Sequence, residues 1–460
     1  MMMRMFKKGI VFIVSILFVL LTACNNNQAK TSSSDESNEN GKEVVTIKVQ
    51  TFGSEKTRLE NLEDSAKKLN QELEAEGKNI EVKLETNAFD GSWEEYRKQF
   101  ILAYKSKNEP DIYLTGHEDI AWLAKGNYIL HLDELKDSEA YSDVYPTLWE
   151  SVTWDGHIWG ALQDTEARPI FYRKDVLKKL GWTDEEIESL PEKVKNGEFT
   201  VEDMTRVAKE AKDAGLVEWG ILHRPVNGSE LHMIAKNFGA ELYDEKVDKL
   251  VFNKEAILET LRYFESLTQK EGVTPESITS MEWKNVHQMM IDGKALFWYG
   301  GIWNVFNYME QGAEFDDIMK NFGFMLVPAT EKGGKPMTLS HPFVHTVSSQ
   351  TEHPELVIRL LELVAAPEYQ AKHSVETFHL PINKSGADVE EFKNDEFLST
   401  VTYMLDYTTF LPNHADFNKY ADAYFKAIQS VELGKKTPEE ALADMEVQLQ
   451  NDLGDEIIVK

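Results

Sequence analysis

The sequence has little cysteine: Cys24 is the only one among its 460 residues. A chain with one cysteine cannot form an internal disulfide, so its fold must be held together by the packing of its core. A chain of this length buries most of its apolar surface on folding and usually divides into more than one domain. We therefore expect a globular protein with more than one domain and no covalent cross-link.

Basic residues are scarce relative to acidic ones, with 49 Lys and Arg against 79 Asp and Glu and a formal net charge of −30. Nucleic acids attract cationic surfaces, so this balance argues against a nucleic-acid partner. It also argues against adhesion to anionic lipid by charge, and it is typical of a soluble surface.

Long apolar runs are lacking except at the N-terminus, where Arg4, Lys7 and Lys8 precede an apolar run over residues 9–21. The run is too short for a comfortable membrane span, which needs about 20 apolar residues. A positive segment, an apolar segment and a small-residue cleavage site are together typical of a secretory signal peptide. We therefore predict that residues 1–23 are a signal peptide and that the protein is exported.

Cys24 directly follows Leu21-Thr22-Ala23. This order resembles the bacterial lipobox, in which the cysteine receives a diacylglyceryl group and becomes the mature N-terminus. An ordinary buried or free cysteine is the alternative. One acyl chain gives only marginal membrane binding, whereas two give stable anchoring. The resemblance implies lipidation of Cys24 and a location on the extracellular face of the cell membrane, with residues 24–42, rich in Ser, Asn and acids, as a disordered tether.

Apolar periodicity predicts alternating strands and helices in the next part of the chain. Residues 44–52 and 80–84 alternate as strands do, and 111–114 form a short apolar strand. Residues 59–73 and 93–104 show the spacing of helices with one apolar face. This order is typical of an α/β fold with a parallel sheet, in which ligands bind at the carboxyl ends of the strands.

That rule places polar residues near a pocket. Glu55 follows the first predicted strand, and His117 and Glu118 follow the third. The alternative for each carboxylate is a solvated surface acid, because the chain has 79 acidic residues.

Patterns for metal, nucleotide and catalytic sites are also lacking. His341 and His345 are four residues apart, but Pro342 argues against a helix there and no third ligand is evident. No Gly-Lys-Ser or Gly-Lys-Thr follows a strand, as a phosphate-binding loop requires. No local motif distinguishes a pair of carboxylates for glycoside hydrolysis. We predict no metal, no cofactor and no catalytic residues.

A series of loose motifs runs through residues 44–453, and their order and spacing are more specific than any one of them. They include Glu109-Pro110-Asp111-Ile112, Gly156-His157-Ile158-Trp159-Gly160, Phe171-Tyr172-Arg173-Lys174-Asp175, Gly300-Gly301-Ile302-Trp303 and Gly434-Lys435-Lys436-Thr437-Pro438. The series resembles the extracellular solute-binding proteins of ABC importers, family 1, the sugar-binding group that includes maltose-binding protein.

The resemblance implies an α/β fold of the periplasmic-binding-protein type II, with two lobes, an interlobe ligand cleft and a hinge. Lobe 1 is predicted to comprise residues 43–163 and 324–348, and lobe 2 residues 164–323 and 349–460. Crossings between the lobes are expected at Ala161–Glu166, near Phe322–Pro328 and near Thr346–Ser349.

The resemblance also implies ligand contacts in the loop after the third strand, before Tyr172 and beside the Gly-Gly pair. Sugars present hydroxyl edges and apolar faces, which carboxylates and flat aromatic rings suit. The alternatives are that Asp164 and Arg168 pair with each other, that His341 is a turn residue, and that Trp303 belongs to the core. The candidate ligand-binding residues are Glu55, His117, Glu118, Asp164, Glu166, Arg168, Trp303, His341 and Phe343.

The implied function is capture of a carbohydrate, an oligosaccharide, by a monomer that delivers it to the permease subunits of an ABC importer. After the first strand, Ser54-Glu55 replaces the acid–lysine pair of maltose-binding protein, and Thr115 replaces a tryptophan, so we expect a different sugar. Two alternatives remain: binding of a non-sugar solute, and an exported enzyme that acts on polysaccharide.

Overall fold

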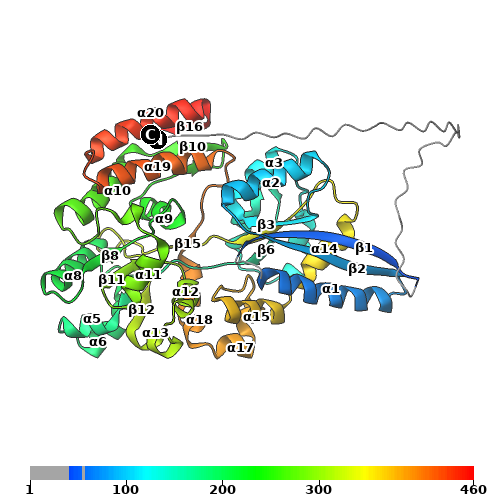
Figure 1. The fold of residues 1–460 in the computed structure, drawn as a ribbon, viewed down its shortest axis with the longest axis horizontal. Helices are drawn as coiled ribbons and strands as arrows, with labels where there is room; N and C mark the ends of the chain where they lie inside the picture. Colours follow the sequence, from blue (N-terminus) through cyan, green and yellow to red (C-terminus); the bar gives the residue numbers. More distant parts are fainter. Residues whose placement is uncertain (1–40, 54–56) are drawn as a thin grey trace, which may run out of the picture.

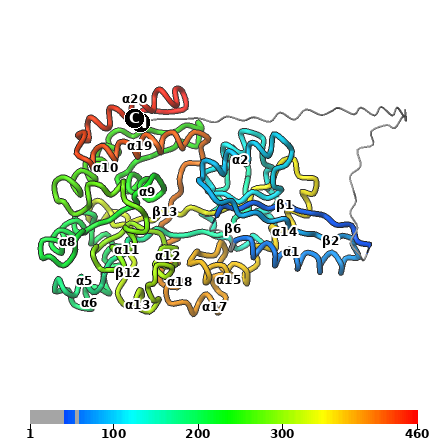
Figure 2. Tube along the Cα trace, in the orientation of Figure 1, coloured from blue at the N-terminus to red at the C-terminus, as the bar shows by residue number. Residues whose placement is uncertain are grey.

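The computed structural model describes residues 41–53 and 57–460. The predicted signal peptide, Cys24, nearly all of the tether and Glu55 lie outside the described residues. Two lobes lie side by side, each with its own sheet (Figures 1 and 2). Within residues 41–53 and 57–460, no helix combines the length and the apolar character that a membrane span requires.

The first lobe is built on a sheet of strand order β2-β1-β3-β14-β6. β1 is parallel to β2 and to β3, which confirms the three predicted parallel strands. β14 returns antiparallel between β3 and β6. The strands are β1 (Glu43–Phe52), β2 (Ile80–Phe89), β3 (Ile112–Gly116), β6 (Ala161–Asp164) and β14 (Phe343–Val347), and a separate hairpin joins β4 (Thr153–Trp154) to β5 (His157–Ile158).

Helices cover this sheet with the faces that their spacing predicts. Along α1, the apolar side chains from Leu59 to Leu73 are buried, and they join the core that also contains Val357 and Leu361 of α14. Ser92 and Glu95 form a capping box that starts α2. The helices of this lobe are α1 (Thr57–Ala75), α2 (Trp93–Lys105), α3 (Ile120–Lys125), α4 (Leu148–Val152) and α14 (Pro354–Val364).

The second lobe is built on a mixed sheet of order β12-β7-β11-β8. Every residue of three of its four strands, β12, β7 and β11, is buried. Continuous apolar runs of this kind are typical of strands covered on both faces. The strands are β7 (Ile170–Arg173), β8 (Trp219–Leu222), β11 (Ala295–Tyr299) and β12 (Phe322–Met325); a smaller sheet contains β9 (Tyr243–Asp244), β10 (Lys249–Phe252) and β16 (Ile457–Val459).

Helices surround the second sheet, and capping residues start two of them. Thr200 and Asp203 form the capping box of α8, and Thr437 and Glu440 form that of α20, with Pro438 in its first turn. The helices are α5 (Lys174–Lys179), α6 (Asp184–Glu188), α7 (Leu190–Lys195), α8 (Val201–Asp213), α9 (Ser229–Asn237), α10 (Lys254–Glu265), α11 (Trp283–Ile291), α12 (Asn304–Glu310), α13 (Phe315–Asn321), α18 (Glu396–Val401), α19 (Phe417–Glu432) and α20 (Pro438–Leu453).

Three crossings connect the two sheets and cores. The first runs between β6 and β7, over residues 165–169, as the sequence predicts to within a few residues. The second runs between β12 and β14 and contains β13 (Thr338–Leu339), which pairs with β15 (Thr408–Thr409). The third follows α14 and passes through α15 (Pro367–Thr377), α16 (Lys384–Asp388) and α17 (Glu390–Lys393).

The predicted lobe boundaries differ from these cores in two places. Residues 324–348 are predicted in lobe 1, but β12 pairs with β7, and Leu326 and Val327 belong to the second core. Residues from 349 onward are predicted in lobe 2, but α14 packs on α1. The expected crossing near Thr346–Ser349 is therefore wrong. Short apolar strands fit either sheet, and only pairing with distant strands decides between them.

Candidate functional site

A cavity of about 640 Å³ lies between the lobes, and we call it the interlobe cleft. Its walls come from both lobes and from the crossings. From the first lobe and the segment before β14 the lining residues are Phe52, Trp93, Glu94, Arg97, Lys98, Ile101, Glu118, His341 and Phe343. From the second lobe and the other crossings they are Glu166, Arg168, Arg224, Asn227, Gly228, Ser229, His232, Trp303, His379, Leu411, Phe417, Asn418, Ala421 and Asp422.

The structure brings most of the predicted contact residues together in this cleft. Those that line it are Glu118, Glu166, Arg168, Trp303, His341 and Phe343. Asp164 and His117 are buried and are not among its lining residues. Glu118 and Glu166 are not solvated surface acids, because their side chains are only 17% and 4% exposed.

Asp164 links α1 to α15 beneath the cleft. Its Oδ2 lies 2.5 Å from Nε of Arg58 on α1 and 2.9 Å from Nε2 of His373 on α15. Burial alone would raise the pKa of Asp164, but the charges of Arg58 and the nearby histidines outweigh it and hold this pKa well below its usual range. The alternative pairing of Asp164 with Arg168 is wrong, because Arg168 contacts Glu166 instead.

The first crossing places Glu166 and Arg168 at the base of the cleft. Arg168 Nη1 donates to Glu166 Oε1, and its Nε lies 3.5 Å from Oε1 of Glu230 on α9. The backbone N–H of Arg168 donates to Oγ1 of Thr338 at 2.7 Å, which links two crossings. Burial raises the pKa of Glu166 although Arg168 opposes the rise. This corner of the cleft thus combines buried hydrogen-bond donors and acceptors.

Trp303 lies against this charged corner. Its ring is parallel to that of His379, at 9° and 6.2 Å, and the Arg168 guanidinium is 4.9 Å from the Trp303 ring centroid. A Cβ at Gly301 would approach the Trp303 ring to 1.9 Å, so glycine is required for the ring to fold back there. The half-buried ring also packs on the second core, and it therefore has a core side and a cleft side.

The opposite wall carries aromatic rings, of which the sequence analysis predicted Phe343 and missed Phe52 and Trp93. Phe52 and Trp93 are stacked at 4.0 Å and 8°, and Phe343 lies 5.8 Å from Trp93. The helical spacing of Trp93 with Tyr96 indicates a core face, and that pattern concealed the role of Trp93 in the wall. Arg97, one turn along α2 from Trp93, also lines the cleft and was also missed. No local signal distinguishes these positions, because the cleft forms only when distant segments meet.

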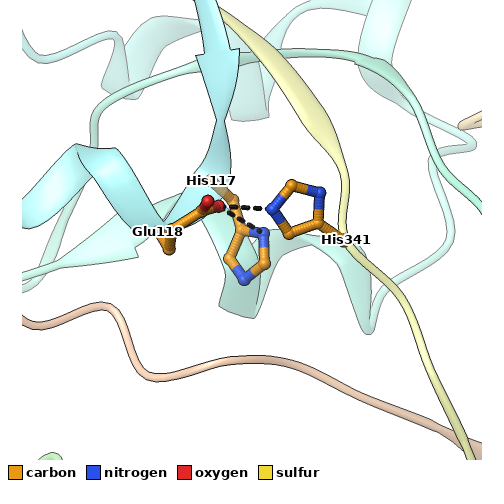
Figure 3. Close-up of side chains that lie close together, drawn as sticks. All are labelled: His117, Glu118 and His341. Carbon is orange, nitrogen blue, oxygen red and sulfur yellow. Dashed lines mark ion pairs between the residues drawn. The ribbon is translucent and has the colours of Figure 1, made fainter. Parts of the chain in front are cut away.

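His117, Glu118 and His341 form a compact cluster on the first-lobe side (Figure 3). His341 Nε2 lies 2.6 Å from Oε2 of Glu118, and His117 Nδ1 lies 3.9 Å from the same oxygen. Arg97 Nη2 is 3.6 Å from the other carboxylate oxygen, Oε1. Burial and the neighbouring His341 lower the pKa of His117 to about 3. Glu118 raises the pKa of His341 despite burial, which favours the protonated form of this imidazole beside the carboxylate.

The chain is similar in sequence to known bacterial binding proteins. A family model described as "Bacterial extracellular solute-binding protein" matches residues 60–371. The maltodextrin-binding protein MdxE of Bacillus subtilis (strain 168) is 23% identical over 451 residues, which cover 96% of each chain. The galactooligosaccharide-binding protein of the same strain is 22% identical over 449 residues, again 96% of each chain.

A solved structure extends the similarity to the fold. The sugar-binding protein MalE from Xanthomonas citri superposes with a TM-score of 0.73 at 17% sequence identity, and the match covers 89% of this chain and 98% of that one. At this identity the superposition shows the type II binding-protein fold.

Proposed function

This chain belongs to the bacterial extracellular solute-binding protein family, in its maltose-binding-like group, and from that premise we propose that it captures an oligosaccharide for an ABC importer. One observation carries the proposal: aromatic rings from both lobes face one cleft whose base is lined with buried charged groups. Phe52, Trp93 and Phe343 supply one wall, and Trp303 and Phe417 the other. Rings suit the apolar faces of sugars, and carboxylates and guanidinium groups suit their hydroxyls.

The names of two relatives suggest which sugars to test first. One relative is named for maltodextrin and another for galactooligosaccharide, so glucose- and galactose-based oligomers form the first panel. The family and fold are those of binding proteins, and we propose that the chain returns these sugars unchanged.

A thermal-shift screen with a graded panel of oligosaccharides tests the proposal. A ligand present at about 100 times its Kd should stabilise the protein by about 2.7 kcal/mol. Chromatography of the recovered sugars should show no new products. The proposal fails if no oligosaccharide raises the melting temperature, and the enzyme alternative gains support if products accumulate.

We further propose that Cys24 anchors the protein to the extracellular face of the membrane, where it meets the permease. The support is the order Leu21-Thr22-Ala23-Cys24 after a positive and apolar segment. Cys24→Ser should abolish incorporation of labelled palmitate and leave an unprocessed precursor or a shed protein. Equal incorporation into wild type and variant would contradict this proposal.

A further inference from the structure

The cluster of His117, Glu118 and His341 has a feature that sugar binding does not explain. One candidate ligand atom from each side chain lies within 4.8 Å of the others. We propose that this cluster binds a divalent transition-metal ion, best matched by Zn²⁺, with a fourth coordination position open to the interlobe cleft. Two imidazoles and a carboxylate are a ligand set that zinc uses in open, three-residue protein sites.

The distances fit such an ion. Ligand atoms about 2.1 Å from a tetrahedral zinc stand roughly 3.4 Å apart. The Glu118 Oε2 atom is 2.6 Å from His341 Nε2 and 3.9 Å from His117 Nδ1, so the observed separations bracket this value. Figure 3 shows both imidazole rings turned toward the carboxylate. Small rotations of the side chains would therefore complete the geometry.

Unpaired polar atoms point to the same place. Neither ring nitrogen of His117 makes a well-aligned hydrogen bond with any of the described residues, and Oε2 of Glu118 has only its ion pair with His341. The His117 side chain is fully buried. Buried polar atoms in native proteins almost always have a partner. His117 Nδ1 lies 3.9 Å from the Glu118 carboxylate, so an ion between them would give this buried nitrogen a partner.

The surrounding backbone holds the three side chains in position. The N–H of His117 donates to the Pro342 carbonyl at 3.0 Å, which fixes the segment of His341 beside β3. A Cβ at Gly116 would lie 2.4 Å from Glu118 Oε2 and 2.8 Å from His341 Nε2, so only glycine leaves room for them. Arg97 contacts Oε1 of Glu118, as outer-shell partners do, and leaves Oε2 for the ion. Asp119 compensates the Arg97 charge at 2.8 Å.

A second cluster provides a matched control. His131, Asp133 and His157 also bring three ligand atoms together, but all three side chains are between 42% and 57% exposed. There, Nδ1 of His157 is already hydrogen-bonded to Asp133 Oδ2 at 2.7 Å. The exposed cluster thus also has two histidines and a carboxylate, but its side chains are not buried.

Calorimetric titration of Zn²⁺ into chelator-treated, sugar-free protein tests the proposal. We expect one tight site, weakened more than about 100-fold in His117→Ala and in His341→Ala, because loss of an outer-shell partner alone costs 10–100-fold. His131→Ala should leave that site unchanged. Mg²⁺ should not compete, because it prefers oxygen ligands in octahedral geometry. The proposal is overturned if no tight site exists, if His117→Ala keeps it, or if His131→Ala removes it.

Two further measurements keep the answer independent of misfolding and of sugar binding. If an alanine variant melts at a much lower temperature, Glu118→Gln, which preserves the shape, replaces it in the comparison and should show the same loss. Co²⁺ should give the visible absorption of a tetrahedral site in wild type and not in Gly116→Ala, which keeps every ligand but displaces two. Zinc is the only ligand titrated, so the result stands whether or not an oligosaccharide binds.

Discussion

Trp303 tests whether the cleft binds sugar through its rings. Trp303→Ala should weaken oligosaccharide binding by about 2 kcal/mol or more, because removal of a central aromatic anchor costs at least that much. This corresponds to about a thirtyfold rise in Kd. Calorimetric titration gives the affinity, and thermal melting without ligand gives the stability.

Trp219 is the matched control for Trp303, because it is also half-buried in the second lobe but does not line the interlobe cleft. Trp219→Ala should leave the affinity for sugar unchanged. Unchanged affinity in Trp303→Ala, together with a loss of stability of about 3–5 kcal/mol, would mean that this ring serves only the core.

Asp164 should matter for stability at neutral pH and less in acid. Asp164→Asn removes the buried carboxylate charge that lies 2.5 Å from Arg58 Nε, which should cost about 3–5 kcal/mol of unfolding free energy. The pKa of Asp164 is lower in the folded state than in the unfolded state, so its contribution is present above about pH 4 and is lost as the pH falls further. Urea unfolding should show that the difference in unfolding free energy between wild type and variant becomes smaller below about pH 4.

The exposed Asp316 on α13 supplies the comparison for Asp164. Asp316→Asn should stay within about 0.5 kcal/mol of wild type, as surface substitutions usually do. The ion-pair explanation would be contradicted if Asp164→Asn lowered the unfolding free energy by the same amount at pH 6 and below pH 4.

At the scale of one element, α1 and α14 hold the first lobe together through an apolar seam. Leu62 of α1 is completely buried in it. Leu62→Ala should reduce the free energy of unfolding by about 2–5 kcal/mol, through lost burial and the cavity left behind. Chemical denaturation measures this loss, and Glu63→Ala, an exposed position on the same helix, should change it little. Equal effects of the two substitutions would show that the seam is not packed as described.

Helices such as α1, α8 and α20 could be predicted because their signals are local: apolar spacing and capping residues lie within a few residues of each other. The sequence does not predict which sheet a short apolar strand joins, because that depends on pairing with strands far away in the chain. β12 is the example. The same limit applies to the site. Glu118 and Trp303 follow from motifs, whereas Trp93 and Arg97 line the cleft only because α2 faces another lobe.

At the scale of the whole molecule, the cleft lies between lobes joined by crossings, so its ligand should draw the lobes together. We expect a saturating oligosaccharide to reduce the radius of gyration measured by small-angle X-ray scattering. A sugar that the protein does not bind serves as the control and should leave the curve unchanged. Tight binding with no change in scattering would show that this protein does not close around its ligand.

The position of β14 has a consequence for how the protein acquires its structure. This strand lies between β3 and β6, yet it comes from Phe343–Val347, far downstream of both. The first sheet therefore cannot be completed until most of the chain is available, and contacts between such distant segments slow folding. The first sheet of a nascent chain would therefore lack β14 for most of its synthesis. Such a delay would suit the export that we propose, because an exported polypeptide crosses the membrane before it folds.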